Sequence, residues 1–242
     1  MEFINQSITN MKLKLNAYTI ISRLFPAVLT SVPILLLLYK MTLEGSYNNF
    51  LEYLKNFQLY GYVSGSFIYL YFYSQIIRYC SKIFENIYFH NRNGYPTTYL
   101  LLYENDRLSK KNKDKFREKA KKDFNFDLMT EEQEKNNLKE SIRELNDITQ
   151  QILAKNRKNE FVQKHNTWYG FSRNLLGGLP FCIAFSIINA ILARIYFNDE
   201  EFFVLSIVIF VLSLILLSFN KFILVQNAEK FAEKLIAEYL TQ

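Results

Sequence analysis

The chain has 242 residues, 50% of them hydrophobic and 17% aromatic, and it carries 29 Lys and Arg against 23 Asp and Glu. Its mean hydropathy of -0.06 is ordinary for a soluble protein, but this average combines long uncharged segments with one segment dense in charge. The two cysteines and two histidines suit neither a disulfide framework nor a zinc site. No nucleic-acid-binding motif accompanies the net charge of +6, so direct nucleic-acid binding is not expected.

Four apolar segments lie at residues 18–40, 57–79, 174–197 and 202–220. Each approaches the roughly 20 helical residues that cross about 30 Å of hydrocarbon. The segment 81–173 holds 19 of the 29 Lys and Arg, whereas the loop 41–56 holds only Lys55. By the positive-inside rule, 81–173 and both termini face the cytoplasm. The sequence therefore predicts a multi-pass protein of the bacterial inner membrane.

The expected fold class is all-α, with four transmembrane helices and a helical cytoplasmic domain inserted between spans two and three. The chain divides accordingly into an N-terminal membrane hairpin (1–80), the cytoplasmic helical domain (81–173), a second membrane hairpin (174–221) and a C-terminal amphipathic cytoplasmic helix (222–242). The last helix either packs its apolar face on the cytoplasmic domain or lies along the inner leaflet.

The first span contains Pro26 and Pro33, so a kink or local widening is expected between Leu24 and Leu38. In the second span, Gly61 and Gly65 form a small-xxx-small step that lets another helix approach closely.

Tyr69 belongs to a polar face of the second span. This face is either a hydrogen-bonding contact between helices or the lining of a wet path, and its other members are Tyr62, Ser66 and Tyr73.

The cytoplasmic segment shows clear helix signals. The turn-forming residues 91–96 end one helix, and Ser109 begins a charged helix to about Phe124. Thr130 and Gln133 form a capping box for the next helix. Apolar residues then recur on one face and need a partner, either the helix 109–124 or a second copy: Leu138, Ile142, Leu145, Ile148 and Ile152.

Evidence for catalysis is thin, so an enzyme, a cofactor and a metal are not expected. Glu131, Glu132 and Glu134 are explained as first-turn acids favoured by the helix dipole. In the third span, Asn189 is the deepest polar residue and is interpreted as a contact between helices. Arg194, near the outer end, is expected to pair with an acid of the turn that follows: Asp199, Glu200 or Glu201.

Two strings at the membrane junctions of the cytoplasmic segment are the most specific part of the chain. They read Gly94-Tyr95-Pro96-Thr97-Thr98 and Asn166-x-x-Tyr169-Gly170-Phe171-x-Arg173-Asn174-Leu175-x-Gly177. A structural explanation exists for each: Pro96 sets a turn, Gly170 and Gly177 allow tight helix crossing, and Arg173 with Asn174 fixes the cytoplasmic helices to the third span.

With the four-span layout, these strings resemble a group of small bacterial membrane proteins found in anti-phage defence neighbourhoods. The resemblance covers about residues 60–220. It implies a membrane effector of the CBASS, retron or CRISPR-accessory type, in which an infection signal triggers loss of bilayer integrity.

The first hypothesis for function is an oligomeric membrane effector that forms a pore or disrupts the bilayer when its cytoplasmic domain receives a signal. That signal is a nucleotide or a partner protein. The alternative is a non-conducting scaffold or sensor that binds a cytoplasmic protein through its basic helices. The residues expected to control assembly or gating are Gly61, Gly65, Tyr69, Pro26, Pro33 and Asn189.

Overall fold

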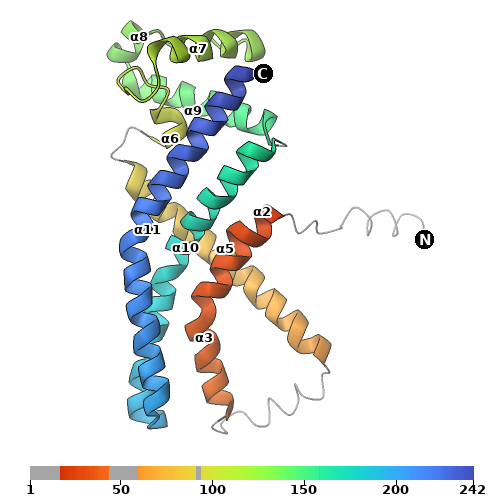
Figure 1. Ribbon diagram of the computed structural model, residues 1–242, viewed down its shortest axis with the longest axis vertical. Coiled ribbons are helices and arrows are strands. Elements are labelled where there is room, and N and C mark those ends of the chain that lie inside the picture. Colours follow the sequence, from red (N-terminus) through yellow and green to blue (C-terminus); the bar gives the residue numbers. More distant parts are fainter. Residues whose placement is uncertain (1–16, 44–58, 91–93, 158) are drawn as a thin grey trace, which may run out of the picture.

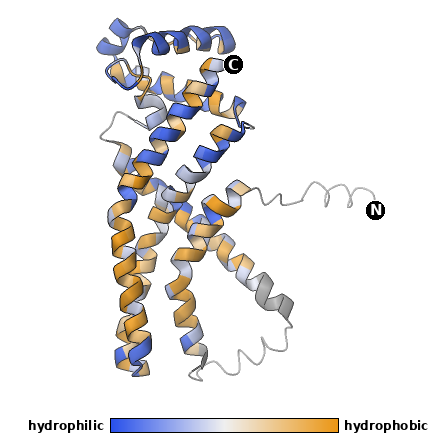
Figure 2. Cartoon of the chain, in the orientation of Figure 1, coloured by the Kyte–Doolittle hydropathy of each residue, from blue (hydrophilic) through white to orange (hydrophobic). Residues whose placement is uncertain are grey.

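The fold is all-helical, as predicted. The computed structural model describes residues 17–43, 59–90, 94–157 and 159–242, and within these ranges it contains helices and no strand (Figure 1). Three helices are long and apolar enough to cross a membrane: Ala17–Met41, Glu160–Phe197 and Glu200–Thr241. Figure 2 shows the apolar residues of these helices gathered toward one end of the molecule and hydrophilic residues at the other.

The predicted second span falls on α5 (Leu59–His90), apart from residues 57–58, which lie outside the described residues. Its 32 residues exceed the length needed to span a bilayer. It is nevertheless not among the three apolar helices, because its tyrosines and serines lower its hydropathy. In Figure 1, α5 crosses the other long helices obliquely and its first half diverges from them.

The helix of the predicted first span contains both α-helical and π-helical segments. It begins as α2 (Ala17–Thr19), widens into the π-helix η1 (Ile20–Leu24) and continues as α3 (Phe25–Leu43). The sequence predicts the widening between Leu24 and Leu38, whereas η1 ends at Leu24, where that interval begins. The reason is that the proline that disturbs the backbone pairing is Pro26, the second residue of α3. The helix runs unbroken through Pro33.

The remaining two apolar helices form an antiparallel pair. These are α10 (Glu160–Leu192), extended by the π-helix η2 (Ala193–Phe197), and the 42-residue α11 (Glu200–Thr241). Asn198 turns the chain with a left-handed φ of 48°, and the Asp199 side chain caps α11 by accepting from Phe202 N at 2.9 Å. Arg194 pairs with Glu200, as one of the expected alternatives, at 2.5 Å.

The centre of the molecule is a close crossing of three helices at two glycines of α10. A Cβ on Gly177 would lie 2.4 Å from the carbonyl oxygen of Ile77 on α5, and one on Gly178 would lie 2.4 Å from Thr30 Oγ1 on α3. Gly170 also faces η1, since its Cβ would lie 3.0 Å from Ser22 Cβ. The expected role of Gly170 and Gly177 in tight crossing is confirmed.

The four helices that the structure describes between α5 and α10 share a core with the end of α11. These helices are α6 (Pro96–Tyr99), α7 (Lys110–Phe124), α8 (Glu131–Asn136) and α9 (Leu138–Lys155). The apolar stripe of α9 packs within the chain, because three of its residues are buried among Leu235, Ile236 and Tyr239 of α11 and Phe116 of α7: Leu145, Ile148 and Ile152. The C-terminal helix therefore packs on the domain, and the stripe does not need a second copy.

Replacing Gly177 by Ala should destabilise the protein, because the new methyl group meets the backbone of α5 and not a flexible side chain. Overpacking of this kind costs roughly 1–3 kcal/mol. Gly65→Ala is the matched control, since a Cβ there would have no neighbour within 4 Å. Thermal melting of the two variants in detergent should give a lower Tm for the first alone, and equal values would contradict the crossing.

Candidate functional site: the cytoplasmic junction

The two junction strings, far apart in the sequence, meet around one cavity. Pro96 and Thr97 of α6 and Asn166, Tyr169 and Arg173 of α10 all line a cavity of about 280 Å³. The three α10 residues follow at three- and four-residue steps, so one face of that helix supplies them. The cavity therefore unites five of the eight residues predicted for the cytoplasmic junction.

A buried carboxylate from α5 occupies the wall of this cavity. The Glu85 side chain accepts a hydrogen bond from Tyr169 Oη, and its Oε2 lies 3.6 Å from Arg173 Nη1. Arg173 also lies over the Tyr169 ring, 5.5 Å from its centroid. Because Glu85 is only 4% exposed, burial raises the pKa of its carboxyl, and the charge of Arg173 opposes that shift. Glu85, Tyr169 and Arg173 therefore form one group of side chains in mutual contact.

Sequence reasoning missed Glu85 and its neighbour Lys82, which also lines the cavity. A signal was present, since Glu85 is the only acidic residue between Glu52 and Glu104. A lone carboxylate just after an apolar segment needs a partner when it is buried.

The other three junction residues stabilise the helix packing. Gly170 lies against η1, and Thr98 is buried in α6. Asn174 Nδ2 donates to the carbonyl oxygen of Ser22 at 2.5 Å, and its Oδ1 accepts from Ser81 Oγ at 3.2 Å. In α-helical pairing the Ser22 carbonyl would face the nitrogen of Pro26, which carries no hydrogen. Asn174 thus supplies a donor that Pro26 lacks.

The residues predicted for assembly or gating do not gather at one place. Asn189 Nδ2 donates to the Pro33 carbonyl at 2.8 Å, which makes it a contact between α10 and α3, as interpreted. Pro26 lies at the junction of η1 and α3. A Cβ added to Gly65 would have no neighbour within 4 Å. The surroundings of Gly61 lie outside the described part of the chain.

The polar face of α5 takes part in a helix contact. Tyr69 stacks on Tyr73 with ring centroids 5.7 Å apart, and Tyr73 Oη donates to the Thr30 carbonyl of α3 at 3.2 Å. This geometry favours the hydrogen-bonding contact over the wet path. Ser66 is exposed, and the side chain of Tyr62 lies outside the described residues.

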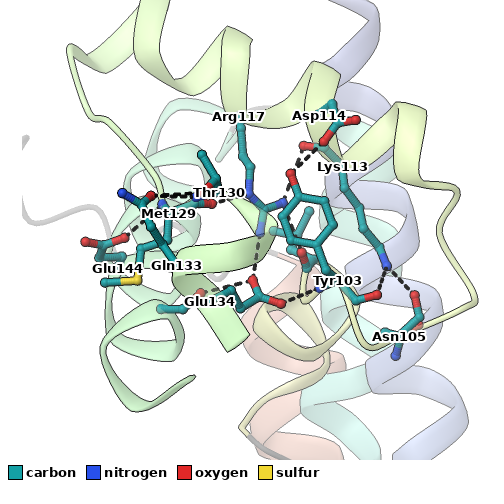
Figure 3. A network of polar contacts seen from close by, with 12 residues as sticks. Tyr103, Asn105, Lys113, Asp114, Arg117, Met129, Thr130, Gln133, Glu134 and Glu144 are labelled. Atoms are coloured by element: carbon teal, nitrogen blue, oxygen red, sulfur yellow. Dashed lines mark hydrogen bonds and ion pairs between the residues drawn. The ribbon is translucent and has the colours of Figure 1, made fainter. Parts of the chain in front are cut away.

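A second buried ion pair lies among α7, α8 and α9 (Figure 3). Arg117 Nη2 donates to Glu134 Oε2 at 2.9 Å, and its other nitrogens donate to the carbonyls of Leu101 and Met129. Glu134 also accepts from Tyr103 N and Ser141 Oγ. This pair is saturated by the protein itself, so its role is to join α7, α8 and α9.

Glu134 lies in the first turn of α8, as the sequence predicts, and it also has a role that the sequence does not indicate. Only 3% of it is exposed, and its carboxylate pairs with Arg117. Glu131, in the same first turn, is partly exposed, and Lys110 and Lys135 hold the pKa of its carboxyl down to about 2. Nothing local distinguishes the two acids, since only tertiary packing places one of them inside.

The two ion pairs differ in what surrounds them. Arg117 and Glu134 use their polar atoms within the protein, whereas Arg173 and Glu85 border a cavity and the buried Nε of Arg173 has no hydrogen-bond partner. Among the described residues, no cluster of His, Cys, Asp and Glu could hold a metal ion. The junction cavity is therefore the candidate site.

No protein-family model matches this chain, and neither a curated protein nor a solved structure shows significant similarity to it.

Stability should depend on pH through Glu85. Its pKa is raised in the folded chain, so the stability that its protonation contributes is complete below about pH 4.5, its ordinary pKa, and is lost as the pH rises through the folded value. Glu85→Gln keeps an acceptor for Tyr169 and cannot ionise. The Tm of this variant relative to the unmodified protein should increase between pH 4.5 and pH 8.

The control for this measurement is Glu132→Gln, which removes an exposed carboxylate. It should leave the pH dependence of the Tm unchanged. A Glu85→Gln profile parallel to that of the unmodified protein would contradict the role of this carboxyl.

Proposed function

We propose that the chain is an oligomeric inner-membrane effector whose cytoplasmic domain receives a signal and whose membrane helices then permeabilise the bilayer. The observation that carries the proposal is the composition of the junction cavity. Its walls come from α5, α6, α9, α10 and α11. Of these, α5, α10 and α11 continue without interruption into the apolar part of the molecule (Figures 1 and 2). A change at the cavity can therefore be transmitted along rigid helices.

In this proposal α5 also crosses the membrane, as the second of four spans, with both termini and the segment 81–173 in the cytoplasm. The distribution of Lys and Arg supports this orientation, because the turn 198–201 carries no basic residue and the segment 81–173 carries 19. The outer end is then the turn between α10 and α11, and the cytoplasmic end is the α6–α9 domain.

The surface of α5 supports assembly of several copies. Large apolar side chains recur at steps of three and four residues along one exposed face: Ile68, Phe72, Ile76, Tyr79, Ile83 and Ile87. Ile83 and Ile87 extend this face beyond residue 79, where the predicted span ends. Such a stripe is suited to a neighbouring helix, and the open surface at Gly65 permits its close approach.

The proposed signal is infection by a phage, on the resemblance of the junction strings to membrane proteins of defence systems. The alternative function is a non-conducting scaffold. One observation favours it: α7 carries exposed lysines at the hydrophilic end of the molecule, where a cytoplasmic protein could bind (Figures 1 and 2). The two functions differ in whether the bilayer stays intact.

Dye release from liposomes separates these two functions. The purified full chain, reconstituted with trapped carboxyfluorescein and given lysate from phage-infected cells, should release dye several-fold faster than with lysate from uninfected cells. Protein-free liposomes given the same lysates are the control. Release that never exceeds this control would contradict the effector and leave the scaffold.

Assembly should depend on Gly65. Leucine at this position fills space that is empty within one chain, so Gly65→Leu should leave the Tm of the protein unchanged and reduce the oligomer fraction on native gels several-fold. Leu36→Ala on α3 is the comparison, because the first span can repack around a smaller side chain. Equal oligomer fractions in the two variants would argue against assembly through α5.

A further inference from the structure

A second cavity adjoins the junction cavity. It measures about 420 Å³ and shares three lining residues with the first: Gln150, Leu153 and Asn166. Arg23 of η1 and Arg157, which follows α9, also line it. The two cavities are adjacent and share one wall, and together they are called here the junction cleft, between the cytoplasmic domain and the membrane helices.

The junction cleft is strongly basic. Lys82 and Arg173 line its first part, and Arg23 and Arg157 line its second. The only acid among these lining residues is Glu85, whose carboxylate is already engaged by Tyr169 and Arg173. Within the described residues, no carboxylate forms an ion pair with any of the other three basic residues: Arg23, Lys82 and Arg157.

Cations without an ion-pair partner that line one cleft from separate elements call for an anionic ligand. Arg23 comes from η1, Lys82 from α5 and Arg157 from the end of α9. Neutral donors are added by Asn166 and Gln150, which line both cavities. A phosphate group accepts several charge-assisted hydrogen bonds at once, and Arg is suited to give two of them. The combined space also accommodates a small ligand and not a polymer.

We propose that the junction cleft binds a phosphate-bearing ligand. Two sources share this chemistry: the headgroup of an inner-leaflet anionic phospholipid, which basic pockets at the cytoplasmic ends of membrane helices recognise, and a soluble nucleotide. This inference rests on the proposed function in one respect, since it names the chemical class of the signal that the cytoplasmic domain receives.

Binding is measured on the full chain in neutral detergent as a rise in Tm, because a ligand that binds only the folded state stabilises it. Trp168, the only tryptophan, lies beside Tyr169 on α10 and reports the transition without a label. The probes are short-chain phosphatidylglycerol, ATP and, as a zwitterionic comparison, short-chain phosphatidylcholine. Phosphatidylglycerol or ATP should raise the Tm at concentrations at least about tenfold below those of phosphatidylcholine.

The variant is Lys82→Gln with Arg157→Gln. Both side chains are exposed, so the protein should fold normally, and the loss of two charges should weaken binding about tenfold or more. Lys111→Gln with Lys115→Gln removes the same charge from exposed positions on α7 and is the matched control. It should bind as the unmodified protein does.

A response to phosphatidylglycerol alone supports the lipid source, and a response to ATP supports the soluble source. A response to neither overturns the proposal, as does equal weakening in the two double variants. The outcome is independent of dye release: binding without leakage removes the effector function and keeps the site, whereas leakage without binding does the reverse.

Discussion

The crossing of α10 with α5 and α3 at Gly177 and Gly178 sets the geometry of the whole molecule. Because a Cβ at Gly177 would meet the α5 backbone at 2.4 Å, the two helices touch through their main chains and cannot slide past each other freely. This contact sets the register of α5 against α10, and further contacts follow at successive helical turns. Ser81 reaches Asn174 one turn away, and Glu85 reaches Tyr169 after two. The buried carboxylate is thus placed by a contact between glycine and backbone.

Two buried amides of α10 bind backbone carbonyls of η1 and α3. Asn174 donates to the Ser22 carbonyl, which lacks an α-helical donor because Pro26 carries no N–H, and Asn189 donates to the carbonyl of Pro33. Hydrogen bonds are stronger away from water, so these amides fix α3 against α10 with directional bonds that apolar contacts alone would not provide. They hold the helices together up to the junction, where the charged residues begin.

The two buried ion pairs show how similar chemistry serves different ends. Arg117 and Glu134 lie among carbonyls, an amide and a hydroxyl that use up their hydrogen-bonding capacity, which makes them part of the framework. Arg173 and Glu85 border open space and have Lys82 as a further neighbour. A framework pair gains nothing from a ligand, whereas a pair beside an open, basic cleft changes its electrostatic balance when an anion enters. The pair of Arg173 and Glu85 is therefore the one suited to ligand binding.

The sequence alone determined the helical class, three of the apolar spans, the capping box at Thr130 and the apolar face of α9, because each depends on periodicity or composition within a short segment. It also marked both junction strings, and Gly177 within them, as points of close contact. Tertiary structure decided which surfaces meet. Glu134 and Glu131 look alike in the sequence, yet only one is buried, and Gly65 resembles Gly177 but has no neighbour. The stripe of α9 found its partner in α11, at the far end of the chain. Such pairings follow from the angle and register at which helices cross, and these depend on all the packed side chains together, which no local pattern contains.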